Sequence, residues 1–393
     1  MARYEDAATV LREALDDMVR RGDADGQVLA AARLSDVLMK YCGTEEGEAL
    51  LRAHPPGPDT PALAVATHHL AAGSLRFVTG RYEEAHASAR IAQEAADTVP
   101  GGERRGLLAR SLGMRATSLA LAGRFDLARP AAERALPHAE AYGDQELLVT
   151  TLSVLREHAR RSGRLAEAVS TGRRALRLAE HTGDPTAVAF ERANLAELHL
   201  LLREFAEARE HAEAAAREGG SQRSWCTPYA LAALARVRVR TGEAGAGELL
   251  DRAGRAAEAQ ADRQALHEVR TAQAELLVRE GRPAGALDLL GRDSGPGTAH
   301  LVAWAELHAG RPEAAVRRAA EEIRRAGQVG ERLAETEART VLGAALAACG
   351  RRQAADEEFG RAAALAAELP YPAGSFRVEQ ARAQAGPVLP GAP

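Results

Sequence analysis

The chain has 393 residues, a net charge of −4 and a pI of about 6.3, with 46 % hydrophobic and 27 % charged residues. Acidic and basic residues alternate along it, which is typical of solvated helix faces and excludes the basic stripe of a nucleic-acid binder. Aromatic residues make up only 4 %, so the core must be built mainly from alanine and leucine.

A short phrase recurs along the chain, in which Gly-Arg is followed by an aromatic residue or Leu, two further residues and Ala. Clear copies begin at Gly80, Gly123 and Gly163. A related phrase opens the chain at Arg3, and degraded copies begin at Arg203, Gly242, Gly281, Gly310 and Gly350. The spacing is roughly 40 residues, which is the length of one supersecondary unit in a repeat array.

A small residue stands at the same position of each copy of the phrase. We expect two helices to touch at this position with no room for a longer side chain. The residues concerned are Ala7, Ala85, Ala128, Ala168, Ala208, Gly247, Ala286, Ala315 and Ala355.

The segments between the phrases have helical periodicity. Residues 145–162 and 165–181 each carry apolar residues at steps of three and four, which predicts a pair of helices. Gly143 and Gly183 mark helix ends, and Pro185 suits the first turn of the next helix. No segment has the β-branched alternation of a strand. The sequence therefore predicts an all-α fold of stacked antiparallel helix pairs.

This repeat resembles the tetratricopeptide repeat (TPR), in which a first helix is followed by Gly-x-Tyr/Phe-x-x-Ala at the start of a second. The resemblance covers about residues 1–369 and implies a right-handed superhelical solenoid that binds a partner. Units of this length resemble the sensor arrays of bacterial signal-transduction NTPases and of MalT-like and AfsR-like regulators. Two departures are the absence of the family's helix-A Trp from most units and the first phrase, which has no first helix before it.

We predict one repeat array over residues 1–369, then a short helix and a flexible tail over 370–393. The glycine-rich segment 291–297 interrupts the array, and it is either a truncated loop, which we favour, or a hinge. The incomplete first unit suggests a chain cut from a longer protein, or an N-terminal edge that a partner or a second copy covers. The second case predicts a homodimer.

Catalytic and metal sites are not indicated. The only lysine, Lys40, does not follow a glycine-rich loop, so there is no phosphate-binding P-loop. The 12 histidines show no metal-ligand spacing, and we read them as helix-surface residues. Cys226 has no evident base and is more simply a residue near a helix start. We predict no enzyme activity, no cofactor and no metal.

First helices line the concave face of TPR arrays, and helical spacing selects which of their residues lie there. The resulting polar band holds Asn194, the only asparagine, whose amide can donate to and accept from a peptide backbone. The alternative is a solvated concave wall with Glu–Arg pairs within the chain. The predicted groove residues are Glu157, Arg160, Asn194, Glu197, Arg236, Glu275 and Trp304.

The leading hypothesis is a non-catalytic array that binds a protein, a peptide or a small-molecule effector in a bacterial signalling or transcription-regulatory system. The alternatives are a stand-alone adaptor that self-associates and, last, an enzyme with an unrecognised site. Without a signal peptide or an apolar stretch of membrane-spanning length, we expect a cytoplasmic protein with no membrane contact and no direct nucleic-acid binding.

Overall fold

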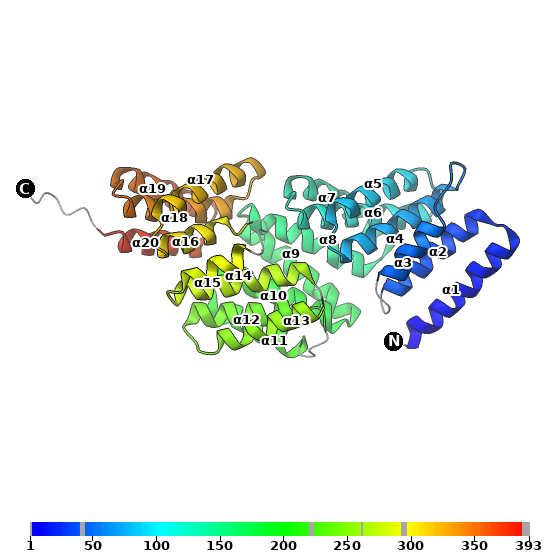
Figure 1. The fold of residues 1–393 in the computed structure, drawn as a ribbon, viewed down its shortest axis with the longest axis horizontal. Helices are drawn as coiled ribbons and strands as arrows, with labels where there is room; N and C mark the ends of the chain where they lie inside the picture. The colour runs from blue at the N-terminus through cyan, green and yellow to red at the C-terminus, as the bar shows by residue number, and fades with distance from the viewer. Residues whose placement is uncertain (1, 40–43, 220–223, 261, 292–296, 387–393) are drawn as a thin grey trace, which may run out of the picture. The chain divides into compact units, whose positions relative to one another are not determined.

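The computed structural model describes the whole chain except residues 1, 40–43, 220–223, 261, 292–296 and 387–393. Within the described residues every regular element is an α-helix, as the periodicity predicts (Figure 1). The chain divides into two compact units, residues 1–155 and 156–393, which are treated separately below. The division falls inside one helix and has no signal in the sequence.

The first unit contains seven complete helices and most of an eighth, and α4 to α7 form successive helix pairs. Their bounds are α1 Ala2–Arg21, α2 Ala24–Met39, α3 Glu45–Ala53, α4 Ala62–Val78, α5 Tyr82–Ala96, α6 Glu103–Leu121, α7 Phe125–Tyr142 and α8 Gln145–Arg161. The last six residues of α8 belong to the second unit.

The second unit continues the same alternation of helices to the end of the described chain. Its bounds are α9 Leu165–Thr182, α10 Pro185–Leu201, α11 Phe205–Glu218, α12 Thr227–Thr241, α13 Ala246–Ala259, α14 Arg263–Arg279, α15 Pro283–Gly291, α16 Ala299–His308, α17 Pro312–Val329, α18 Arg332–Ala348, α19 Arg352–Glu368 and α20 Pro372–Gln384. The predicted helices 145–162 and 165–181 match α8 and α9 within one residue.

The glycine of the repeated phrase closes a tight turn between the two helices of a pair. Its φ is positive in the clear copies, +75° at Gly80, +79° at Gly123 and +80° at Gly163, a region that side chains with a Cβ rarely adopt. One copy has Arg203 in place of the glycine, and Arg203 keeps the same left-handed geometry with φ of +60°. Arg203 is therefore a strained residue, which the alignment of the copies alone would flag as unusual.

The small residue of the phrase is buried in most copies, which confirms the predicted close contact there. Its relative exposure is 0 % at Ala85, Ala128, Ala168, Ala208, Ala286 and Ala315 and 2 % at Ala355. The prediction is wrong at Gly247, which is exposed because a second turn glycine, Gly245, moves the start of α13. It is also wrong at Ala7, where the next residue, Ala8, is the fully buried one.

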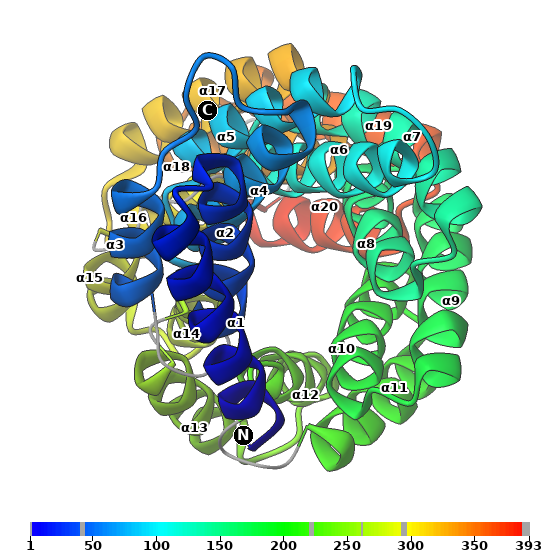
Figure 2. The ribbon, with the colours of Figure 1, turned by 90° about the vertical axis from the view of Figure 1, so that its right-hand side faces the viewer.

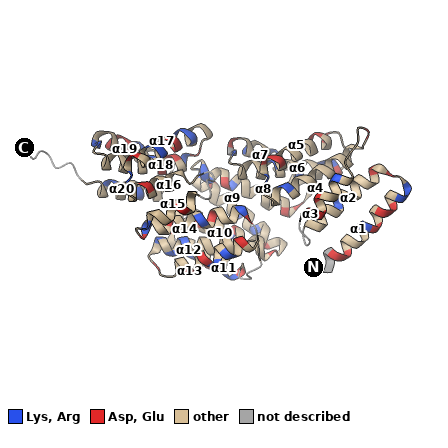
Figure 3. Ribbon diagram, in the orientation of Figure 1, with Lys and Arg blue, Asp and Glu red and all other residues tan. Residues whose placement is uncertain are grey.

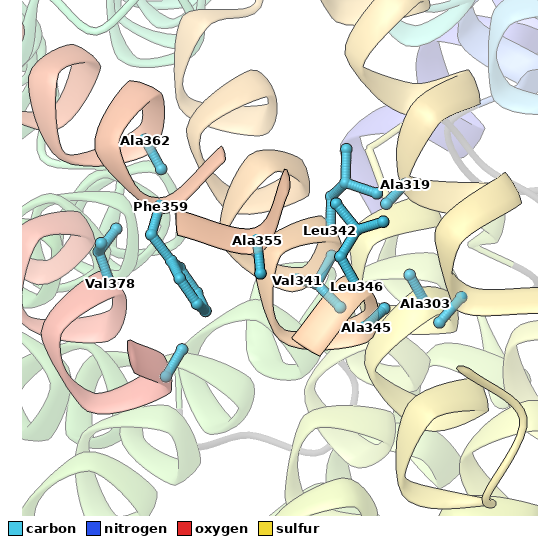
Figure 4. Close-up of a cluster of buried hydrophobic side chains, with 12 residues drawn as sticks. Ala303, Ala319, Val341, Leu342, Ala345, Leu346, Ala355, Phe359, Ala362 and Val378 are labelled. Carbon is cyan, nitrogen blue, oxygen red and sulfur yellow. The ribbon is translucent and has the colours of Figure 1, made fainter. Parts of the chain in front are cut away.

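The core is assembled from small aliphatic clusters between successive helix pairs, as the low aromatic content requires. The cluster around Phe359 joins α16 to α20 and consists otherwise of alanine, valine and leucine (Figure 4). Close helix approach here depends on Gly343 of α18, where a Cβ would lie 2.8 Å from two ring atoms of Phe359.

The two segments outside the regular array are short. Helix α15 ends at Gly291 and α16 begins at Ala299, so most of the predicted interruption at 291–297 lies outside the described residues. After α19 the chain forms α20, and the tail expected beyond Gly386 also lies outside them. Among the described helices, none is long and apolar enough to cross a membrane.

Candidate functional site: a polar band on the inner helices of the second unit

The second unit has an inner and an outer layer of helices. Helices α10, α12, α14, α16, α18 and α20 each pack against the next in this series, whereas α9, α11, α13, α15, α17 and α19 pack mainly on their chain neighbours. Because the layer of shorter circumference is the one whose members touch, the first series forms the concave side. Figure 2 shows α10 and α12 inside α11 and α13. We call the first series the inner helices.

The band begins at the C-terminal end of α8, where one carboxylate holds two guanidinium groups. Arg160 donates to both oxygens of Glu157 at 2.7 and 2.6 Å, and Arg161 donates to the same carboxylate at 2.6 Å. Burial by itself would raise the pKa of Glu157, but the two arginines outweigh it and hold that pKa well below its usual range. Glu157 is therefore ionised under ordinary conditions.

The centre of the band lies between α10, α12 and α14. Arg236 of α12 donates to Glu197 of α10 and, at 3.4 Å, to Glu268 of α14. The Arg236 side chain is only 12 % exposed, whereas both carboxylate side chains keep about a third of their surface in solvent, 30 % for Glu197 and 37 % for Glu268. Burial raises the pKa of Glu197, and Glu268 adds to the effect, while Arg236 opposes it. Two carboxylates here share one buried guanidinium.

Further along, the band reaches α20. Arg240 pairs with Glu275 at 3.4 Å, and the net effect of nearby arginines overcomes burial and lowers the pKa of Glu275. Glu337 of α18 accepts from the Tyr371 hydroxyl at 2.7 Å and from Arg377 of α20 at 3.0 Å. Charges of both signs are interspersed along these helices (Figure 3).

Two predicted groove residues lie apart from these ion pairs. The Asn194 amide donates to the Phe190 carbonyl one turn earlier at 2.8 Å, and its side chain is half-buried. Trp304 of α16 is half-buried, packs against the Phe359 cluster and lies 5.9 Å from the His308 ring. The structure thus places Glu157, Arg160, Glu197, Arg236 and Glu275 in the network of charges, with Asn194 beside it and Trp304 further along the inner helices.

Sequence reasoning missed several members of the band. Glu268 lies seven residues before Glu275, and Arg240 lies four residues after Arg236. Following the same face of each first helix for one or two more turns would therefore have found both. Glu337 occupies on α18 the position that Glu268 occupies on α14, thirteen residues before the turn glycine, so the same extension would have found it. Arg377 gave no such signal, because α20 lies outside the repeat and only the fold brings it to the inner helices.

The second unit also has contacts between its N-terminal and its C-terminal helices and turns. Arg161 at the end of α8 donates to Glu331, before α18, at 3.0 Å, and the Glu331 side chain is 2 % exposed. The Arg203 guanidinium lies 3.8 Å from the ring centroid of Phe376 on α20. Helix α20 packs against α10 as well as against α18 and α19. These contacts join residues about 170 positions apart in the chain.

The described residues offer little for covalent or metal chemistry. No group of three or more His, Cys, Asp or Glu side chains among them is placed to hold a metal ion. Cys226 is fully buried, and burial raises the pKa of its thiol, which disfavours the nucleophilic thiolate. The shallow surface pocket lined by Gly350, Arg351 and Glu357 includes none of the predicted groove residues.

Comparisons with known proteins identify structures with a similar fold but do not assign the chain to a family. No family model and no curated protein matches the sequence. Among solved structures, a Rap protein in complex with Competence and Sporulation Factor is similar at 14 % identity, with 93 % of this chain and 99 % of that chain covered and a TM-score of 0.57.

Two other solved structures are similar at lower TM-scores. The apo form of the quorum sensor NprR from B. thuringiensis matches at 12 % identity over 93 % of this chain and 97 % of that one, with a TM-score of 0.49. A signal-transduction ATPase with a tetratricopeptide repeat sensor, from Pyrococcus horikoshii, matches at 13 % identity over 96 % and 54 %, with a TM-score of 0.42. The similarity to the Rap protein shows the fold of this chain, an array of stacked helix pairs.

Proposed function

We propose that this chain is a non-catalytic array that binds a peptide or a peptide-like segment of a protein on the polar band of the inner helices. The observation that carries the proposal is the Glu197–Arg236–Glu268 group, in which charged side chains on three successive helices stay partly exposed on a concave surface. Such a surface offers donors and acceptors to a peptide backbone and selects side chains by charge.

The fold similarity to a Rap protein bound to Competence and Sporulation Factor supports a role in signalling. On this proposal the chain is the sensing or interaction part of a bacterial signalling or transcription-regulatory system and works in the cytoplasm. A small-molecule effector is the alternative occupant of the same band.

The test is retention of peptides from an unbiased synthetic pool of ten-residue peptides on the immobilised chain, read by mass spectrometry. Changing Glu197→Gln together with Arg236→Gln removes two of the three charges of this group, so we expect most retained peptides to be lost. The matched control changes Glu213→Gln and Arg217→Gln, an exposed pair on the outer helix α11, and should retain the same peptides. Equal retention by both variants would contradict binding at the band.

A homodimer through the N-terminal edge has weaker support. Helix α1 packs against α2 through Ala8 and Leu15, and it exposes Val10 at 64 % and Val19 at 50 %. These two valines are nine residues apart and so face opposite sides of the helix, which means that they do not form one apolar patch. Light scattering coupled to size exclusion tests the dimer, and a monomer at all concentrations would remove it.

A further inference from the structure

The second unit gathers aromatic side chains at one end of its inner helices. The whole chain has two tryptophans, six tyrosines and six phenylalanines, yet Phe190, Trp225 and Tyr229 lie together. Their ring centroids are 5.1 Å apart for Phe190–Trp225 and for Phe190–Tyr229, and 6.3 Å apart for Trp225–Tyr229. We call these three residues the aromatic cluster.

The cluster is held rigidly and one ring is exposed. The Trp225 indole N–H donates to the Thr186 hydroxyl at 2.9 Å, and the Tyr229 hydroxyl donates to Asp262, the N-cap of α14, at 3.3 Å. Trp225 nevertheless keeps 45 % of its surface in solvent. A large ring that is already fixed loses little conformational entropy on contact with a partner, and Trp and Tyr dominate the energetics of binding surfaces for this reason.

The cluster and the polar band lie on the same side of the same helices. Phe190 precedes Glu197 by seven residues on α10, and Tyr229 precedes Arg236 by seven residues on α12. Seven residues are close to two full helical turns, so each pair shares one face and is separated by about 10 Å along the helix axis. A ligand lying along these helices would contact the cluster and the band together.

The part of a ligand that lies on the polar band should carry a positive charge. Glu197 and Glu268 share the Arg236 guanidinium as hydrogen-bond donor. Arg160 is close enough to attract both carboxylates, but it donates its hydrogen bonds to the two oxygens of Glu157. A second guanidinium or ammonium group beside Glu197 and Glu268 would balance the two carboxylates, whereas a ligand carboxylate would add a third negative charge. Polyproline II backbone turns the same face to a surface every third residue, after about 9 Å.

From this geometry we propose that the inner helices α10, α12 and α14 recognise an extended peptide with an aromatic residue on Trp225 and an Arg or Lys three residues away on Glu197 and Glu268. The inference rests on the proposed function and specifies its ligand. The aromatic side chain of the peptide makes the apolar contact, and its cation matches the charge of the two glutamates. The number of residues between the two therefore determines which peptides bind.

The experiment uses the full chain without substitutions, and peptide binding is measured by calorimetry. The probes are blocked peptides in which a Phe is followed by Pro-rich sequence with a single Arg at position +1, +2, +3, +4 or +5. We expect affinity to be highest at +3 and to fall about tenfold or more when the Phe is replaced by Ala.

Protein variants locate the two contacts. The Trp225→Ala variant is measured by the same calorimetry, and we expect it to bind the +3 peptide about tenfold or more weakly. Tyr142→Ala, which removes another exposed aromatic ring, from the first unit, should have no effect. Glu197→Gln with Glu268→Gln should abolish the advantage of +3 over the other positions without changing the dependence on Phe.

The outcomes separate this inference from the proposed function. If the unbiased pool is retained but the Phe–Arg series shows no dependence on spacing, on Phe or on Trp225, the array binds peptides by other contacts and the aromatic–cation rule is wrong. If neither the pool nor the series binds, both proposals fail. A +3 optimum that requires Trp225 and the two glutamates supports both.

Discussion

Arg203 provides a quantitative test of how α20 is held in the second unit. It occupies a turn position that is glycine in the clear copies of the repeat, and its φ of +60° costs a residue with a side chain about 1 kcal/mol. Its guanidinium lies 3.8 Å from the centroid of the Phe376 ring, and a cation–π contact at a site this exposed contributes about 0.5–1 kcal/mol. Strain in the turn and attraction to α20 therefore oppose each other.

A double-mutant cycle separates the two effects. In the Phe376→Ala background the change Arg203→Gly relieves the strain and removes only the longer contact with the Phe205 ring, at 5.4 Å, so we expect it to raise the free energy of unfolding by up to about 1 kcal/mol. In the parent chain the same change also removes the contact with Phe376, so its net effect should lie between zero and about 0.5 kcal/mol. The difference between the backgrounds is the coupling between Arg203 and α20.

The measurement is urea unfolding of the four chains, followed by far-UV circular dichroism. The dependence of the free energy of unfolding on urea concentration must be the same in all four, because arrays of repeats need not unfold in one step. Control chains carry Gly310→Ala, which puts a Cβ at an equivalent turn with φ of +74° and nothing within 4 Å, and which should be destabilising through backbone strain. If Arg203→Gly is equally favourable in both backgrounds, Arg203 and Phe376 are not coupled and the reasoning about α20 is refuted.

Three further predictions follow from packing, from hydrogen bonding and from protonation. Gly343→Ala should destabilise the chain by about 1–3 kcal/mol, because the new Cβ meets the Phe359 ring, whereas Gly360→Ala, which meets nothing within 4 Å on α19, should stabilise it by about 0.5–1 kcal/mol. Thermal unfolding of both variants checks this pair, and a gain in stability for both would show that α18 and α19 are not in close contact. Tyr371→Phe removes a buried hydroxyl that donates to Glu337 at 2.7 Å and should cost about 1–2 kcal/mol in urea unfolding. The cost should shrink in a Glu337→Gln chain, and an undiminished cost would place the effect elsewhere. Burial, with the nearby His69 and Arg76, lowers the pKa of His68 in the first unit to about 4, so the unfolded chain binds a proton more readily and stability should fall as the pH drops from about 6.5 towards 4. His68→Leu should flatten that part of the pH profile, and a titration of His68 near its ordinary pKa by NMR would contradict the burial.

The sequence by itself determined the fold class, because the repeated phrase contains the chemistry of its own turn. Gly80, Gly123 and Gly163 have the positive φ that the turn requires, and Ala85, Ala128 and Ala168 are fully buried where two helices touch. These are local effects within about six residues, so pattern and spacing suffice to predict them. The error at Gly247 arose where a second turn glycine, Gly245, shifted the start of the helix, and the error at Ala7 arose inside α1, where the buried position is one residue later.

Helical spacing also predicted the central charged residues of the candidate site, because side chains seven residues apart on one helix share a face. Helical spacing did not predict which residues these charges pair with. That Glu197 and Glu268 share Arg236, that Arg161 contacts Glu331 and that Arg377 reaches Glu337 depends on helices that the chain brings together over 30 to 170 residues.

Only the tertiary structure could decide those pairings, since nothing in a helix's own periodicity states which neighbour it will face. The same holds for the aromatic cluster. Phe190 lies 35 residues before Trp225 in the sequence, and the three rings of the cluster come together only because α10 and α12 pack side by side. Short-range sterics and hydrogen bonding determine local conformation, whereas a binding surface forms when segments that are distant in the chain pack together.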